Sequence, residues 1–267
     1  MSVLKTFEII CSSDENLGAY NKSSDGSTFT LNLSKNRGIY LEGKIMCLIS
    51  AKESTIWYNT PNVVENVNNK LFVEYDDGGG AVEETLEFDS GLYSFNTLAT
   101  QLEVLLSNVG WSNIITLVSN DSTQKAGLKF NVDNVSVLFD GKTETLGELI
   151  GFTDGLDKTA SAGQTVYGNT TANFAQLQYY LISCDLLKNG ISLNGVYRKI
   201  LVRIVPQVGT QVGSQIFHAP FNPSKIRDDS LLNRSIHTIR FTLTDQNGEP
   251  VNTLNENYTV TLAFEYF

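Results

Sequence analysis

The sequence predicts a mainly β protein: an antiparallel β-sandwich with an inserted α/β segment. Apolar and polar residues alternate along most extended stretches, as expected for strands with one face on a core and one in water. Short turns join successive strands, without a regular alternation of strand and helix. About eight candidate strands lie outside residues 89–176, roughly the number that a single jelly roll needs. We therefore expect a jelly-roll domain over residues 28–267, with residues 89–176 as an elaboration on one connection.

The chain is expected to begin with an N-terminal arm, residues 1–27. Residues 12–16 and 21–26 are rich in Ser, Asp, Asn and Gly, which favour turns and loops. Between these two segments, Leu17 and Tyr20 are the residues able to pack against a core. Such an arm either moves freely or docks on a neighbouring subunit.

The first predicted strands differ in how they are covered. Residues 28–33 alternate apolar and polar side chains, which favours a strand covered on one face. Residues 44–50 are apolar on both faces, so we expect a central strand that continues towards Tyr58 and ends before Pro61. Residues 71–75 and 82–88 are expected to pair as a hairpin around the turn Asp-Asp-Gly-Gly-Gly.

An amphipathic helix is expected over residues 97–108. Its apolar residues fall at helical spacing, at Leu98, Leu102, Leu105, Leu106 and Val109. Ser94 or Asn96 could cap its N-terminus. The alternative, two short strands, is disfavoured because Leu, Glu, Gln and Ala are good helix formers.

The rest of the inserted segment mixes short strands, one helical turn and a polar loop. Strands are expected at residues 114–118, 128–132 and 135–139. The last two alternate in opposite phase, so Asp133 and Asn134 mark either a tight turn or a bulge. One helical turn is expected to stop at Gly151, followed by a long loop over residues 153–174.

Strands resume in the C-terminal third, at residues 177–187, 197–205 and 216–219. The chain then closes with two long strands. Ile239, Phe241 and Leu243 alternate with polar residues before a loop, and residues 258–266 repeat the pattern after it. The chain is thus expected to end inside a sheet.

Composition excludes several functional classes. The 267 residues are 41% hydrophobic and 18% charged, with a formal net charge of −10. An acidic chain is poorly suited to phosphate backbones, so we expect no sequence-specific nucleic-acid partner. A set of basic residues could still line a face that meets nucleic acid or an acidic partner, although scattered solvated positions are the simpler interpretation. The set is Arg198, Lys199, Arg203, Lys225, Arg227, Arg234 and Arg240.

Cysteine usage and hydropathy bear on the compartment. Cys11, Cys47 and Cys184 are too few and too irregularly spaced for a disulfide framework, which fits a reducing environment. The first residues do not resemble a secretory signal, and no apolar run is long enough to span a bilayer. We therefore expect a protein that is neither secreted nor anchored by a membrane span.

Catalytic signatures are missing from the sequence. It contains neither a Gly-x-Ser-x-Gly elbow nor a Walker-type loop. The two histidines, His218 and His237, lack partners at metal-ligand spacing. A pair between Cys184 and either histidine stays open, but buried thiols and ordinary histidines are the simpler interpretation. We expect no enzyme, and no catalytic, cofactor-binding or metal-binding residue.

The loop between the last two strands partly resembles a calcium loop. Oxygen-bearing side chains stand at loop positions one, three, five and twelve, at Asp245, Asn247, Glu249 and Glu256. Pro250 occupies the sixth position, where such a loop needs glycine. We interpret the segment as a turn with Asn247 and Gly248 at its tip.

A carbohydrate-binding sandwich is the main alternative function. Glycan sites use exposed aromatic rings, and Trp57, Trp111 or the tyrosines could supply them. Large rings are more often core residues in a β-sandwich. On this alternative the protein is a lectin-like or adhesin-like module that binds host glycans.

An ordered set of segments resembles the penton (minor capsid) proteins of virophages and Polinton-like viruses. Residues 88–102 carry a Gly-x-Tyr-x-x-x-x-Leu entry to a helix, and residues 149–152 resemble the Leu-Gly-Phe step that follows it there. Residues 182–187, 241–251 and 258–266 resemble the last strands of that family. The order and spacing match from about residue 28 to the end, whereas the arm has no counterpart.

The resemblance implies a single jelly roll that stands as a homopentamer at the five-fold vertices of an icosahedral virion. Its neighbour there would be the double-jelly-roll major capsid protein. The resemblance also implies an elaboration that points away from the shell, for which residues 89–176 are the candidate. On this hypothesis the protein is a structural component of the virion, made in the host cytoplasm.

Overall fold

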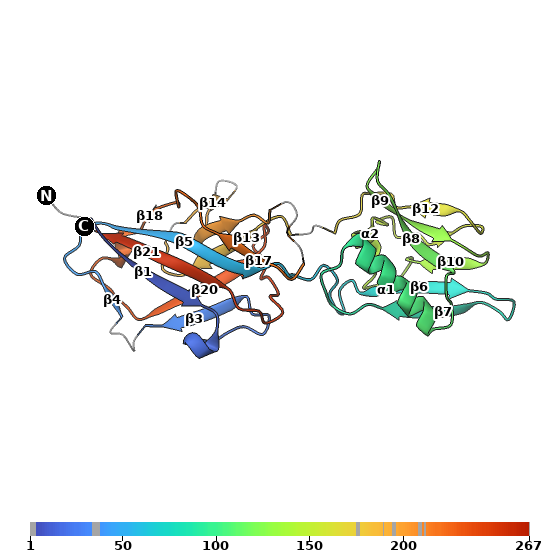
Figure 1. Cartoon of the computed structure of the whole chain (residues 1–267), viewed down its shortest axis with the longest axis horizontal. Helices are drawn as coiled ribbons and strands as arrows, with labels where there is room; N and C mark the ends of the chain where they lie inside the picture. The colour runs from blue at the N-terminus through green and yellow to red at the C-terminus, as the bar shows by residue number, and fades with distance from the viewer. Residues whose placement is uncertain are drawn as a thin grey trace. The chain divides into compact units, whose positions relative to one another are not determined.

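The computed structural model describes residues 4–33, 38–174, 177–188, 190–193, 196–207, 210 and 212–266. The start of the predicted arm and parts of the loops at 188–190 and 209–214 lie outside these residues. The chain folds as two compact units. The first unit joins Met1–Thr60 to Leu177–Phe267, and the second is Pro61–Gln176 (Figure 1).

The first sheet of the first unit brings the two ends of the chain together. Its strands lie in the order β1 (Lys5–Ser12), β21 (Thr259–Tyr266), β5 (Cys47–Trp57) and β17 (Gln215–His218). The short β18 (Ile226–Arg227) also pairs with β5. All these pairings are antiparallel, and every residue of β1 has a partner in β21.

The second sheet has the order β16 (Ile200–Ile204), β13 (Tyr180–Cys184), β20 (Thr238–Thr244), β3 (Thr28–Asn32) and β2 (Ala19–Tyr20). Its pairings are antiparallel too. Two small ribbons stand apart from it: β4 (Ile39–Tyr40) with β19 (Ser235–Ile236), and β14 (Ser192–Leu193) with β15 (Val196–Tyr197). The short 3-10 helices η1 and η3 cover Glu15–Leu17 and Asp229–Leu231.

The order of the eight main strands is that of a single jelly roll. Numbered one to eight along the chain, they are β1, β3, β5, β13, β16, β17, β20 and β21. One sheet then reads 1-8-3-6 and the other 2-7-4-5. This arrangement is the eight-stranded double-sheet fold of jelly rolls, so the predicted fold class is confirmed.

Aromatic rings fill the core between the two sheets. Phe7 stacks on Phe264 with ring centroids 4.8 Å apart, across the pair formed by β1 and β21. Phe29 stacks on Phe241 at 5.1 Å and meets Tyr258 edge-on. The predicted alternation in the closing strands is confirmed, because Ile239, Phe241, Leu243, Val260, Leu262 and Phe264 are all buried.

The second unit is the chain between β5 and β13, and it has its own core. One sheet runs β11 (Lys158–Thr159), β10 (Val135–Leu138), β6 (Lys70–Tyr75) and β7 (Val82–Glu87). The other runs β12 (Thr165–Tyr167), β9 (Lys125–Phe130) and β8 (Ile115–Asn120). The helices are α1 (Phe95–Asn108) and α2 (Gly147–Ile150).

The predicted helix is confirmed, with Leu98, Leu102 and Leu106 buried in the core of the second unit. Ser94 caps it: its hydroxyl accepts from the Thr97 N–H, and the Thr97 hydroxyl accepts from the Ser94 N–H. Residues 133–134 lie in the connection between β9 and β10, which belong to different sheets. The change of sheet explains the opposite phases of the two strands.

Both predicted unit boundaries need correction. Residues 5–12 are not an arm but the strand β1, whose alternating Phe7, Ile9 and Cys11 belong to the core or pack against it. The insert begins at Pro61 rather than at residue 89, because the hairpin β6–β7 buries Leu71, Val73 and Leu86 in the second core. The sequence thus counted one hairpin too many in the sandwich and one edge strand too few.

Candidate functional site

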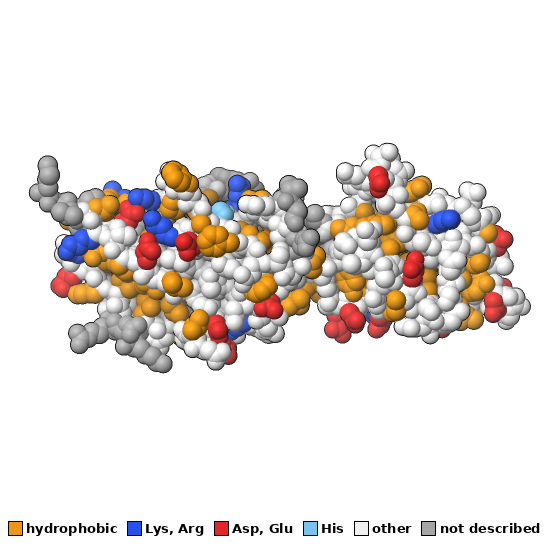
Figure 2. All heavy atoms as spheres, in the orientation of Figure 1, with side chains coloured by type: hydrophobic (Ala, Val, Ile, Leu, Met, Phe, Trp, Pro, Cys, Tyr) orange, Lys and Arg blue, Asp and Glu red, His pale blue; other side chains and the backbone are white. Residues whose placement is uncertain are grey.

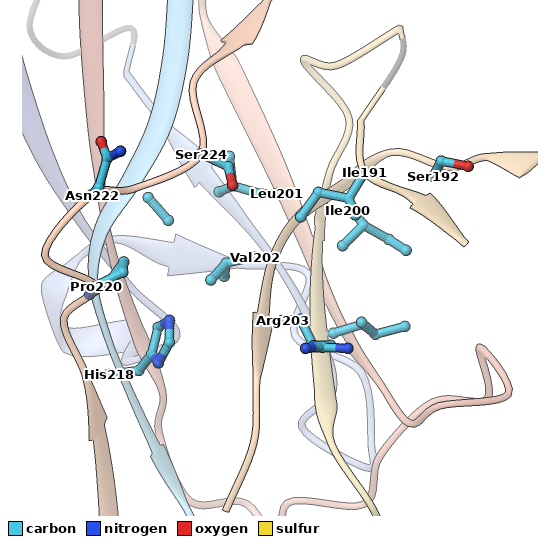
Figure 3. A pocket seen from close by; sticks show the side chains of 12 residues that line it. Ile191, Ser192, Ile200, Leu201, Val202, Arg203, His218, Pro220, Asn222 and Ser224 are labelled. Carbon is cyan, nitrogen blue, oxygen red and sulfur yellow. The ribbon is translucent and has the colours of Figure 1, made fainter. Parts of the chain in front are cut away.

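A cavity of about 330 Å³ opens on the jelly-roll unit, at the side where β16 and β17 are the edge strands. This size falls within the range typical of small-molecule pockets. Figure 3 shows His218 and Pro220 on one side, and Val202 and Arg203 of β16 on the other. The lining residues are Ala51, Leu181, Ile191, Ser192, Ile200, Leu201, Val202, Arg203, His218, Pro220, Asn222 and Ser224.

One wall exists because the outermost strand of the first sheet is interrupted. β17 pairs with β5 at Ser54–Trp57, and β18 pairs with β5 again at Leu48 and Ile49. Within the described chain, residues 50–53 of β5 have no strand partner on that side. The connection between β17 and β18 contains Pro220 and Pro223, and proline cannot donate to a ladder. This connection leaves the sheet and forms the rim of the cavity.

The opposite wall is shaped by an irregularity in β16. The pairing of β13 with β16 shifts between Ile182 and Ser183, which face Val202 and Ile200. Leu201 is therefore an extra residue, as in a β-bulge. Ile200, Leu201 and Val202 are consecutive, yet all three are buried and all line the cavity. The bulge thus concentrates apolar surface at this edge.

The rim carries groups that donate hydrogen bonds. The side chain of His218 is half-buried and makes no hydrogen bond or ion pair within the described part of the chain. Burial lowers the pKa of its imidazole below the ordinary value of 6.5, which favours the neutral ring at pH 7. Arg203 is exposed, and its guanidinium lies 5.4 Å from the centroid of the Tyr179 ring.

None of the described residues that line this cavity is acidic, and Ser192, Asn222 and Ser224 add neutral polar groups. A site with an apolar floor and an acid-free rim of Arg, His and hydroxyl groups favours ligands that accept hydrogen bonds and carry negative charge. The cavity is therefore suited to binding a ligand of this kind.

Large apolar side chains are exposed at several places on the jelly-roll unit. Phe217 precedes His218 in β17 and is 62% exposed, and Phe221 is fully exposed. Val205 and Val212, in the segment between β16 and β17, are about half exposed. On β1, Ile10 is 74% exposed. Figure 2 shows hydrophobic side chains at many points on the visible face of this unit. Exposed apolar side chains that gather into a contiguous patch are typical of interaction sites.

The residues of the predicted basic face contact different partners. Lys225 forms an ion pair with the buried Glu265 at 2.8 Å, and Arg227 pairs with Asp229 at 2.6 Å. Arg203 lies over Tyr179 instead. These contacts favour the interpretation that the basic residues are scattered surface positions. They do not favour a basic face that binds nucleic acid.

The open pair between Cys184 and a histidine has no support in the geometry. Cys184 is buried in the jelly-roll core, and burial raises the pKa of its thiol far above the ordinary value. His218 lines the cavity, whose lining does not include Cys184, and His237 is exposed. Burial likewise raises the pKa of Cys11 to about 12 and that of Cys47 to about 11. All three cysteines are free, buried thiols.

The loop after β20 is a turn, as interpreted from the sequence. The Asp245 carboxylate accepts from the N–H groups of Asn247 at 2.8 Å and Glu249 at 2.9 Å. Gly248 has a positive φ of 92°, and its N–H donates to the Asp245 carbonyl. Across the described residues, no cluster of three or more His, Cys, Asp or Glu is arranged to hold a metal ion.

Trp57 and Trp111 are both half-buried. Trp111 packs edge-on against Tyr75 at 5.8 Å in the second unit. Neither ring is fully exposed. The helices within the described ranges are also too short or too polar to cross a membrane.

Sequence reasoning singled out His218 and Arg203 but did not bring them to one cavity. The available signal was the pair Pro220 and Pro223 directly after a strand, which marks the place where the sheet edge is broken. The bulge at Leu201 could not be predicted in this way, because a run of apolar residues in a sequence is compatible with a regular strand as well as with a bulged one.

Known proteins similar to this chain are found among solved structures. Neither a family model nor a curated protein matches the chain. Among solved structures, it is similar to the crystal structure of the selenomethionine-labelled mavirus penton protein. The sequence identity is 14%, the match covers 99% of this chain and 100% of that chain, and the TM-score is 0.48.

Proposed function

We propose that the chain is a structural capsid protein that forms homopentamers at the five-fold vertices of an icosahedral virion. The observation that carries the proposal is the eight-stranded jelly roll with its strand order 1-8-3-6 and 2-7-4-5. Viral capsid proteins use this fold, although lectins and cupins use it as well. The resemblance of its sequence segments to penton proteins favours the capsid among these.

The exposed surface of the jelly roll supports assembly by unlike contacts. Phe217 and Phe221 lie at the edge formed by β17, whereas Ile10 lies on β1, the strand at the other edge of the same sheet. A closed ring needs two different surfaces that meet at a fixed angle. Burial of exposed apolar side chains between copies would supply the driving force.

On this proposal, the remaining surfaces of the jelly roll contact the double-jelly-roll major capsid protein. The second unit, Pro61–Gln176, is the elaboration that faces away from the shell. It replaces the smaller insert that the sequence predicts. The protein is made in the host cytoplasm and resides in the virion.

Native mass spectrometry and negative-stain electron microscopy test the proposal directly. We expect five-fold rings with the mass of a pentamer, either from the chain alone or together with the major capsid protein. A chain that stays monomeric in both preparations would contradict the proposal.

Paired substitutions locate the interface. Phe217→Ser with Phe221→Ser should disperse the rings into monomers, because it removes the exposed apolar surface at one edge. Leu156→Ser is a matched control, since Leu156 is 60% exposed but lies in the second unit. Rings that persist in the double variant would show that the interface lies elsewhere on the jelly roll.

A further inference from the structure

We propose that the cavity between β16 and β17 binds the carboxylate of a ligand with a compact apolar body. The proposal rests on the shape and lining of the cavity and stands independently of assembly. Its volume of about 330 Å³ suits a small ligand or the terminal residue of a peptide.

The charge of the lining selects the head group of the ligand. Arg203 and His218 are the titratable side chains among the lining residues, and none of these residues is acidic. The ion pairs of the described chain leave Arg203 without an acidic partner. A carboxylate accepts hydrogen bonds from guanidinium in a bidentate geometry, and it would also accept from an imidazole N–H. An ammonium group would find only repulsion from Arg203.

The floor of the cavity selects the body of the ligand. Ala51, Leu201 and Val202 are buried, so the floor is apolar. Pro220 and Ile191 extend the apolar lining. Binding would transfer an aliphatic group from water into this apolar space, which is favourable because its apolar surface is removed from water. The site therefore matches a branched aliphatic acid better than a sugar or a nucleotide.

Two sources could present this chemistry: a free aliphatic acid or the C-terminal residue of a polypeptide. 4-Methylpentanoate represents the first, and N-acetyl-leucine represents the second. 4-Methylpentanamide and N-acetyl-leucinamide keep the shapes and remove the charge. Isoamylamine reverses the charge on a similar body.

The chain contains two histidines, so imidazole NMR signals report on the cavity directly. His218 lines the cavity and His237 is exposed, which makes His237 an internal control. His218→Gln assigns the two signals. We expect the carboxylates to shift the His218 signal in a saturable manner, with the His237 signal unchanged. Bound carboxylate should also raise the pKa of His218, because a nearby negative charge favours the imidazolium.

Arg203→Gln should weaken carboxylate binding by about tenfold, the usual worth of one charge-assisted hydrogen bond. Arg240→Gln is the matched control, because Arg240 is exposed on β20 of the same sheet but does not line the cavity. Both variants replace exposed residues, so both should fold.

The outcomes distinguish the two ligand sources from each other and from results that contradict the proposal. Binding of 4-methylpentanoate alone assigns the site to a free acid, and binding of N-acetyl-leucine alone assigns it to a polypeptide C-terminus. Equal binding of the carboxylates and their amides would overturn the proposal, since the charge would then be irrelevant. Absence of a His218 shift at millimolar carboxylate, or equal shifts of both histidines, would overturn it as well.

Discussion

The two units of this chain differ most in charge. The jelly-roll unit contains 14 Lys and Arg against 13 Asp and Glu, a net charge of +1. The second unit contains 5 against 16, a net charge of −11. The net charge of −10 for the whole chain therefore belongs to the insert. The acidic charge that disfavours nucleic acid therefore lies in the insert, whereas the jelly roll is nearly neutral.

This difference fits different tasks for the two units. Copies of a nearly neutral jelly roll with exposed phenylalanines can approach one another without long-range repulsion. Strongly acidic inserts repel their own copies and stay solvated. The acidic groups are spread over several elements, among them Glu83, Glu84 and Glu87 on β7 and Asp154 and Asp157 before β11.

The units also differ in the range of their contacts. In the jelly roll, β1 pairs with β21, so Lys5 faces Tyr266 across almost the whole chain. In the insert, the hairpins β6–β7 and β8–β9 pair strands that are neighbours in sequence. Local pairings form faster than distant ones because less chain entropy is lost first. We therefore expect the insert to fold independently of the jelly roll.

The largest expected effect comes from deletion of residues 1–12. The sequence alone predicts that loss of residues 1–20 would impair incorporation into shells more than it impairs folding. The structure reverses this expectation, because β1 contributes Phe7, Ile9 and Cys11 to one side of the core. We expect the jelly roll to lose cooperative unfolding in calorimetry while the helical circular dichroism signal of the insert survives. An unchanged melting profile would contradict the assignment of β1.

Core truncations in the two units should affect separate transitions. Phe241→Ala removes a ring stacked on Phe29 and should cost the jelly roll about 3–5 kcal/mol. Leu102→Ala truncates the middle of the three buried leucines of α1 and should lower the stability of the insert by about 2–5 kcal/mol. Chemical denaturation followed by tryptophan fluorescence can separate them, since Trp57 and Trp111 lie in different units. Equal shifts of both transitions by either variant would show that the units unfold together.

A smaller effect is expected at Asn62, which joins the two ends of the insert. Its side-chain amide donates to the carbonyls of Tyr93 at 2.8 Å and Phe174 at 3.1 Å, and accepts from the Tyr93 N–H. Asn62→Ala leaves these backbone groups without that partner and should cost the insert about 1–3 kcal/mol. Thr60→Ala is the comparison, because it removes the hydrogen bond between the Thr60 and Tyr180 hydroxyls within the jelly-roll unit. The Asn62 assignment fails if the two variants shift the same transition.

The smallest expected effect is a dependence on pH at Asp25 in the jelly roll. Desolvation tends to raise the pKa of this carboxyl, but hydrogen bonds from Ser23 and Ser27 outweigh it and leave the pKa below the ordinary value of 3.8. A depressed pKa means that the stabilisation is present above the unfolded pKa and is lost as pH falls through the folded pKa. Asp25→Asn should therefore reduce the loss of jelly-roll stability between about pH 4 and pH 2. The measurement is the denaturation midpoint against pH, and parallel curves for the two proteins would contradict it.

The spacing of apolar residues in the sequence was enough to predict α1 and most of the long strands. Ile239, Phe241 and Leu243 are buried as their alternation predicts, and Leu98, Leu102 and Leu106 form the buried face of α1. These periods are local properties, because the spacing of side chains depends only on backbone geometry. Ser94 as a cap and the turn at Asp245 could be predicted for the same reason.

The tertiary structure alone decided which core each strand joins. Alternation states that one face of a strand is buried but not what covers it, so residues 71–88 were assigned to the sandwich and residues 5–12 to an arm. The partner of β1 stands at the opposite end of the chain, and no local pattern specifies a pairing at that distance. The cavity likewise depends on the tertiary structure, because it forms where the gap between β17 and β18 lies opposite the bulge at Leu201.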